Sequence, residues 1–179
     1  MRWKSSADSY GAVAISIHWL TAAAILGVLG TGLSLDRVGE EAETGVLRVH
    51  VVFGITAFAL TILRIVWWLF ADRRPPEAPD QPRWQAAVAW GVHRLLYLAI
   101  LIMGASGIAM IALSGAGDIL FGGAQRPLPN FFDYAPRGPH GLVAWLLMAL
   151  VALHAGAALY HQFVLRDRLL ARMGVGRRA

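Results

Sequence analysis

Histidine is the residue type whose spacing in this chain best indicates chemistry. His140, His154 and His161 lie in one apolar run and are separated by fourteen and seven residues. Because an α-helix turns by about 100° per residue, both intervals return to nearly the same direction, and all three imidazoles are expected on one helix face. His140 and His154 would stand about 21 Å apart along the axis. This arrangement indicates two stacked metal centres, and imidazole is a standard axial ligand of haem iron.

Histidines from other apolar runs can complete both centres. His50 begins the second run on the same side as His140, so these two can meet across one haem. His18 lies toward the opposite side, where depth alone allows either His154 or His161 as its partner. The spacing favours His154, because the gap of about 31 Å between His140 and His161 would leave the second haem at the water surface.

Three further side chains are candidates for the surroundings of the second haem. His161 and His93 could bond a haem propionate or a quinone oxygen, or donate a proton, although each could also simply cap a helix interface. Arg64 is the only charged residue within an apolar run. We expect its guanidinium to pair with a propionate, and the alternative is that it extends to the lipid headgroups. Polar groups inside a membrane are costly, and most are functional.

The elements that must position these side chains are four apolar runs, each long enough to cross a hydrocarbon core of about 30 Å. The helices that we expect have about these ranges: 11–35, 46–71, 84–117 and 138–165. An acidic loop, a proline-rich linker and a long loop separate them, at 36–48, 72–83 and 118–137. The predicted fold is an all-α integral membrane bundle of four helices, up-down-up-down, forming one domain without an internal repeat.

Positive charge predicts the orientation of the bundle. Of the 16 Lys and Arg residues, four fall in the first and third loops: Arg37, Arg48, Arg126 and Arg137. Because Lys and Arg concentrate in cytoplasmic segments, we expect both termini to face the cytoplasm, in the inner membrane of a bacterium. No cleavable signal peptide is expected, since the first apolar run is too long for the core of one.

Composition narrows the possible cofactors and partners. Hydrophobic residues make up 57% of the chain, more than is ordinary for a soluble domain. The chain has no cysteine, which excludes disulfides, iron–sulfur clusters, thiolate ligation and covalent haem attachment. Any haem must therefore be held non-covalently by His or Met. The net charge of +5 does not indicate nucleic acid, because the basic residues flank apolar runs instead of forming one stripe.

Segments around the histidines resemble the bacterial cytochrome b-561 family over nearly the whole chain. YGAVAISIHWLTAAAILGVLGTGL, which contains His18, resembles the family's first helix. The later helices are matched in order by LRVHVVFGI at His50, HRLLY at His93, PHGLVAWLL at His140, and LHAGAALYHQFVLRD at His154 and His161. The resemblance implies two b-type haems with His18, His50, His140 and His154 as axial ligands. It also implies electron exchange with a quinone, most simply ubiquinone.

Three hypotheses follow for the function. In the first, which rests on similarity to the superoxide oxidase branch of the family, a basic funnel including Arg126 and Arg137 attracts superoxide at the outer face. His161 then binds or protonates the quinone, with His93, Arg94 or Arg64 as alternatives. In the second, the protein is an electron-carrier cytochrome b subunit that links quinone or quinol to a dehydrogenase or another partner protein, for instance through the 118–137 loop. The third is a structural or transport bundle without a cofactor, which would show no haem spectrum.

Overall fold

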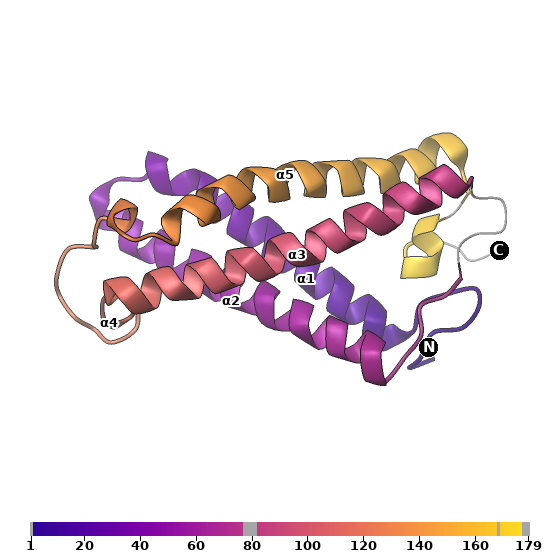
Figure 1. Cartoon of the computed structure of the whole chain (residues 1–179), viewed down its shortest axis with the longest axis horizontal. Coiled ribbons are helices and arrows are strands. Elements are labelled where there is room, and N and C mark those ends of the chain that lie inside the picture. The colour runs from indigo at the N-terminus through magenta and orange to yellow at the C-terminus, as the bar shows by residue number, and fades with distance from the viewer. Residues whose placement is uncertain (1, 77–81, 168, 177–179) are drawn as a thin grey trace.

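Four long helices make up most of the chain, as the computed structural model in Figure 1 shows. The structure describes residues 2–76, 82–167 and 169–176. The helices are α1 (Ala12–Ser34), α2 (Glu40–Phe70), α3 (Arg83–Ser114) and α5 (Arg137–Tyr160), with the short α4 (Ala116–Leu120) after α3. All four long helices are apolar enough to cross a membrane, and the described ranges contain no strand. The predicted all-α bundle of four membrane helices is confirmed.

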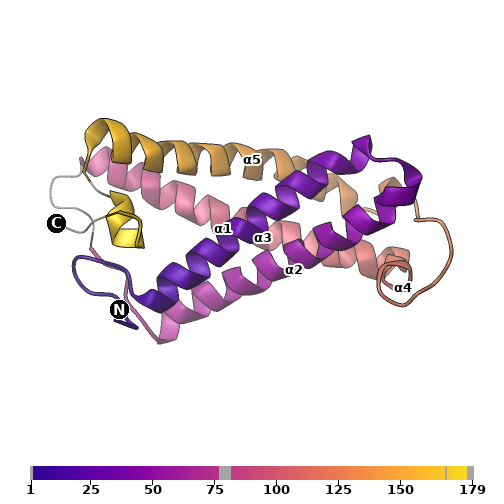
Figure 2. The same ribbon diagram turned by 180° about the vertical axis from the view of Figure 1, so that it is seen from behind.

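Successive long helices run in opposite directions, and both ends of the chain lie at the same end of the bundle (Figures 1 and 2). α1 packs most extensively on α2, which makes a first hairpin, and α3 packs on α5, which makes a second hairpin. α4 and the loop after it lie at the end away from the termini. We call that end the outer end and the other the inner end, in keeping with the orientation that the charges predict.

Three helix ends differ from the prediction. α5 ends at Tyr160, and the last five residues of the predicted range form a π-helical turn, His161–Leu165. α2 begins at Glu40 and not near residue 46, so most of the predicted acidic loop is helical. Its first turn carries Glu40, Glu41 and Glu43, and carboxylates are favourable at the positive end of a helix dipole. α3 ends at Ser114, before the predicted residue 117, because Gly115 adopts the left-handed conformation with φ 67° and stops the helix.

The connecting segments are partly ordered by short helices. The predicted 118–137 loop begins within α4 and contains a 3-10 turn at Phe131–Asp133. Part of the predicted proline-rich linker, at 77–81, and residues 168 and 177–179 of the basic tail lie outside the described residues. At the inner end, a 3-10 turn at Leu169–Met173 folds back, and the Met173 carbonyl accepts a hydrogen bond of 3.0 Å from the indole N–H of Trp19.

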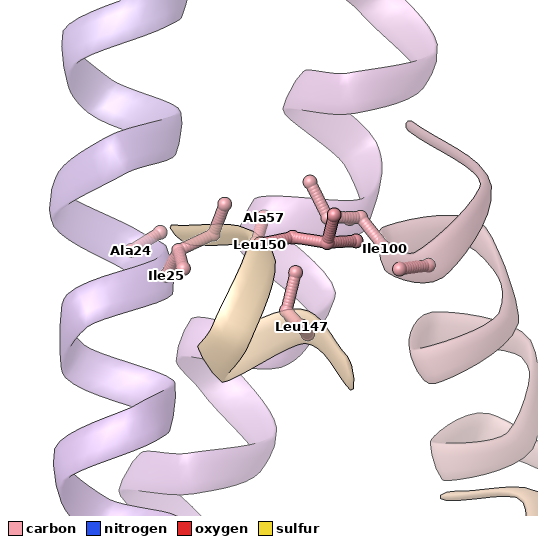
Figure 3. Packing of buried hydrophobic residues seen from close by; sticks show 7 residues of the cluster. Ala24, Ile25, Ala57, Ile100, Leu147 and Leu150 are labelled. Atoms are coloured by element: carbon pink, nitrogen blue, oxygen red, sulfur yellow. The ribbon is translucent and has the colours of Figure 1, made fainter. Parts of the chain in front are cut away.

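A small apolar cluster fills the middle of the bundle, where side chains from all four long helices meet (Figure 3). Its members are Ala24, Ile25, Ala57, Ala99, Ile100, Leu147 and Leu150. Leu147 is 2% exposed and stands seven residues from both His140 and His154, so the cluster lies midway between them. Large side chains on the outside, such as Leu142 and Trp145, stay exposed, as lipid-facing residues do.

Candidate functional site: two histidine pairs

The first histidine pair lies at the outer level. His50 from α2 and His140 from α5 face each other with ring centroids 6.4 Å apart and an angle of 64° between the rings. An iron with one imidazole on each side needs centroids about 6.3 Å apart, because metal–nitrogen bonds are about 2.0–2.1 Å and each centroid lies about 1.1 Å beyond its nitrogen. The pair is therefore spaced as two axial ligands of one iron would be.

A hydroxyl group from the neighbouring helix determines which nitrogen of His50 is available. Thr31 Oγ1 lies 3.1 Å from His50 Nδ1 and also donates a hydrogen bond of 2.8 Å to the carbonyl of Gly27. Because the hydroxyl hydrogen is engaged by that carbonyl, the hydroxyl oxygen accepts from Nδ1–H. Nε2 then carries a free lone pair, which is the form in which imidazole binds a metal.

The second hairpin repeats this arrangement around His140. Ser106 Oγ lies 2.9 Å from His140 Nδ1 and donates a bond of 2.7 Å to the carbonyl of Ile102. A glycine follows each hydroxyl residue. A Cβ atom would stand 3.1 Å from the His50 ring at Gly32 and 3.4 Å from the His140 ring at Gly107. One residue therefore orients each imidazole, and the next leaves room beside it.

The second histidine pair lies at the inner level. His18 from α1 and His154 from α5 have ring centroids 6.2 Å apart with 75° between the rings, which again suits one iron. The His93 ring is 5.1 Å from that of His154, closer than a shared iron would allow. Arg64 Nη1 lies 2.7 Å from His18 Nδ1, while Arg64 Nε is buried without a partner among the described residues. This guanidinium has an unmet capacity for an anion.

The two hairpins carry the same spacing of functional residues, a repeat of positions and not of residue types. Thirteen residues separate His18 from Thr31, and thirteen separate His93 from Ser106. Fourteen separate His50 from Arg64, and fourteen separate His140 from His154. The contacts follow the same pattern, since the first and second hairpins each pair one inner residue with another, Arg64 with His18 and His154 with His93. The repeat is hard to see in the sequence because the matched residues differ in type.

The donor set suits haem better than a bare metal ion. Among the described residues, no group of three or more His, Asp or Glu side chains could hold a metal ion. A porphyrin supplies four equatorial nitrogens itself and needs from the protein only two axial ligands, which each histidine pair can provide. The spacing of the rings, the Nδ1–H tautomer at the outer level and the room beside Gly32 and Gly107 all fit this group.

The remaining inner candidates lie in different places. His93 and Arg64 belong to the cluster around His18 and His154. Arg94 instead lies over the ring of Trp90, with 3.6 Å between its guanidinium carbon and the ring centroid. His161 is in a π-helical turn after α5, where it is hydrogen-bonded to Asp167. Sequence reasoning missed Asp167, although a carboxylate six residues after a histidine at the end of an apolar run was visible.

The arginines of the outer end fall into two groups. Arg48 and Arg126 line one open pocket of ≈ 550 Å³ together with Thr44, Ile119, Gly123, Ala124, Gln125 and Pro127. Arg48 Nε donates to the Leu120 carbonyl at 2.6 Å, which holds its side chain against the segment at the end of α4. Arg137 is not part of this lining and lies over the ring of Phe132 at 4.6 Å. The structure therefore joins Arg126 with Arg48 and places Arg137 elsewhere.

The chain is similar to known proteins along most of its length. A family model described as prokaryotic cytochrome b561 matches residues 9–176. A cytochrome b562 of Cereibacter sphaeroides is 32% identical over 92% of this chain and 94% of its own. Cytochrome b561 homolog 1 of Escherichia coli K12 is 32% identical, covering 89% of this chain and 93% of its own. A protein of Yersinia pestis named probable superoxide oxidase CybB is 29% identical over 92% and 94%.

Proposed function

The chain belongs to the prokaryotic cytochrome b561 family of bacterial membrane electron carriers with b-type haem, and from this premise we propose that it oxidises superoxide and reduces ubiquinone. Two superoxide ions each lose one electron and leave as oxygen, and one ubiquinone gains both electrons and two protons. The Yersinia pestis relative supports this choice of donor through its name. We place the protein in the bacterial inner membrane with both termini in the cytoplasm.

One observation carries the proposal: two histidine pairs with the spacing of axial ligands lie at two levels of the same bundle. We assign His50 and His140 to an outer haem and His18 and His154 to an inner haem. When bound, the two haems supply one-electron transfer between the faces of the membrane. The apolar cluster around Leu147 lies between the two levels and excludes water from the interior.

Residues at the two ends have distinct roles in this proposal. At the outer end, Arg48 and Arg126 line the pocket that attracts superoxide, although Asp118, 3.9 Å from Arg126, offsets part of the charge. Arg137 lies outside this lining, against Phe132. At the inner end, Arg64 would bind a haem propionate, and its buried Nε, which lacks a partner among the described residues, supports this role. His161 hydrogen-bonds to the quinone or protonates it, and His93 lies beside the inner pair, where it can assist.

A specific observation favours a second candidate, in which the protein carries electrons between ubiquinone and a partner protein. The outer loops expose large aromatic side chains, with Phe132 76% and Phe121 55% exposed. Such residues are enriched where proteins dock. This candidate uses the same haems but needs no superoxide chemistry.

Rapid-mixing absorbance on the oxidised holoprotein tests the proposal. Superoxide should reduce the haems quickly, and added ubiquinone should reverse the reduction. If ubiquinol reduces the haems and superoxide does not, the carrier function is supported and the oxidase function is wrong. Absence of any haem spectrum from protein purified out of haem-replete cells would contradict both.

A further inference from the structure

A carboxylate stands against His161 where the chain leaves the membrane helix. α5 ends at Tyr160, and the chain continues as a π-helical turn, His161–Leu165. Arg166 then takes a left-handed conformation with φ 54°, and it is the one non-glycine residue with positive φ in the described part of the chain. This reversal returns Asp167 to His161, whose Nδ1–H donates a hydrogen bond to the carboxylate. π-helical turns and strained backbone both occur preferentially at functional sites.

The two partners differ in their access to solvent and in their other bonds. The His161 side chain is 15% exposed and that of Asp167 is 41% exposed, so the imidazole is sheltered while the carboxylate reaches the surface. Asp167 Oδ1 accepts the backbone N–H of Leu169 at 3.1 Å, and Oδ2 accepts from the imidazole. Because Nδ1 is committed to Asp167, Nε2 is the nitrogen that His161 has available for a ligand.

The same turn holds a second polar group with unused bonding capacity. The side-chain oxygen of Gln162 is buried and has no hydrogen-bond partner among the described residues. Buried polar atoms are nearly always paired in folded proteins, so an unpaired one suggests that something polar binds there. Asp167 accepts the backbone N–H of Leu169, the first residue of the 3-10 turn at Leu169–Met173. The Met173 carbonyl of this turn accepts from the indole of Trp19, which lies beside His18 and so links this region to the inner level.

We propose that Asp167 is the positioning residue for His161, and that the pair delivers one of the two protons which ubiquinone takes up; this rests on the proposed function. Each carbonyl oxygen of ubiquinone gains one electron, originating from superoxide, and one proton. For one of these oxygens, the Nε2–H bond of the His161 imidazolium breaks and a new O–H bond forms. Asp167 holds the ring orientation and stabilises the imidazolium until transfer, and water restores the proton from the aqueous side.

Asp167→Asn separates this role from a structural one. The amide keeps an oxygen for the Leu169 N–H, so the last turn stays capped, but its NH2 group cannot accept the Nδ1–H of His161. The test mixes dithionite-reduced holoprotein with a short-chain ubiquinone and follows haem reoxidation. We expect reoxidation at saturating quinone to be at least about tenfold slower, with a larger solvent deuterium isotope effect, while quinone affinity measured by equilibrium binding stays within about twofold.

Two further variants complete the test. Asp167→Glu retains the acceptor and should restore most of the rate. Asp133→Asn makes the same chemical change in the 3-10 turn at the outer end and should have no effect. If Asp167→Asn reoxidises as fast as the wild type, or if the loss appears only in quinone affinity, the inference is wrong and the proposed function stands. If ubiquinone does not reoxidise the wild-type protein, the proposed function fails, and the inference fails with it.

Discussion

Arg64 Nη1 lies 2.7 Å from Nδ1 of His18. A guanidinium can only donate hydrogen bonds, so Nδ1 accepts here and the hydrogen of the neutral ring sits on Nε2. This is the opposite tautomer to that of His50, whose Nδ1–H is held by Thr31. Iron ligation by a neutral His18 through Nε2 therefore requires Arg64 to turn away. Its Nε, which has no partner among the described residues, can then bind an anion as well. A propionate of the inner haem would have the charge that this guanidinium can bind.

Removing the charge of Arg64 should lower the midpoint potential of the inner haem. One positive charge about 8–10 Å from the iron, at an effective dielectric constant of about 20, favours the reduced state by about 2 kcal/mol. Arg64→Leu should therefore lower the midpoint potential by on the order of 50–100 mV. Arg64→Lys keeps the positive charge, so its potential should stay close to that of the wild type. Redox titration of the haem absorbance measures both variants. Equal midpoint potentials in the Arg64→Leu variant and the wild type would mean that Arg64 extends to the lipid headgroups instead.

Loss of a single ligand should remove a single haem. His140→Ala should empty the outer site and His154→Ala the inner site, each lowering the haem-to-protein ratio from about two to about one. His161→Ala should keep both haems. Quantification of extracted haem against protein checks all three. A His161→Ala protein that loses a haem while His154→Ala keeps both would show that His18 pairs with His161.

The hydroxyl groups of Thr31 and Ser106 should tune the outer haem. An imidazole whose Nδ1–H is donated to an oxygen is a more basic ligand and favours the oxidised iron. Replacement of the two by Val and Ala should raise the outer potential by on the order of tens of millivolts. Thr56→Val is a matched control, because Thr56 is also on a long helix and donates to the carbonyl four residues earlier, that of Val52. If Thr56→Val shifts the outer potential as much as the joint replacement of Thr31 and Ser106 does, the proposed role of these two hydroxyl groups is wrong.

Neutralising the outer pocket should slow the encounter with superoxide. Arg126→Gln should reduce the rate of superoxide-driven haem reduction about threefold to tenfold, and should weaken its dependence on ionic strength, because the effect is electrostatic. Arg37→Gln removes the same charge at the same end, outside the pocket lining, from a side chain that bonds to the Leu33 carbonyl. If both variants slow haem reduction by superoxide equally, the net charge of the outer end controls the rate and the pocket is not a local binding site.

Asp72 should contribute stability that depends on pH. Its partial burial opposes ionisation, but hydrogen bonds from the Ser5 backbone and hydroxyl, the Arg73 N–H and the Trp67 indole outweigh this and hold its pKa below the ordinary value. A lowered folded-state pKa stabilises the fold above the unfolded value of about 3.9, and this contribution is lost as the pH falls through the lowered value.

Asp72→Asn should therefore lower stability at pH 7 by about 1 kcal/mol, with the difference from wild type shrinking below about pH 4. The temperature at which the haem spectrum is lost in detergent, compared between variant and wild type at pH 7 and below about pH 4, checks this difference in stability. Asp8→Asn, an exposed carboxylate in the same N-terminal segment, is the control and should behave like the wild type. A difference that persists in acid would show that the carboxylate's charge is not involved.

The sequence predicts most of the fold and of the histidine pairing because both depend on periodicity. The spacing of His140 and His154, with the depth of His50 and His18, was enough to predict the pairs that the structure brings together. The hydroxyl contacts were not predictable, since Thr31 and His50 are 19 residues apart and Ser106 and His140 are 34 apart, on different helices. The contact of Asp167 with His161 likewise depends on a backbone reversal at an arginine, which no local residue preference indicates.

The hairpin organisation has a consequence for biogenesis. Each proposed iron would be held by two imidazoles, one from the first hairpin and one from the second. Neither hairpin alone could therefore retain a haem. The haems would then hold together two hairpins that insert into the membrane separately. The cellular supply of haem would therefore limit assembly of the protein. A fragment that ends in the linker between α2 and α3 and a fragment that begins there should assemble into a haem-binding protein when they are co-expressed. Each fragment expressed alone should be degraded.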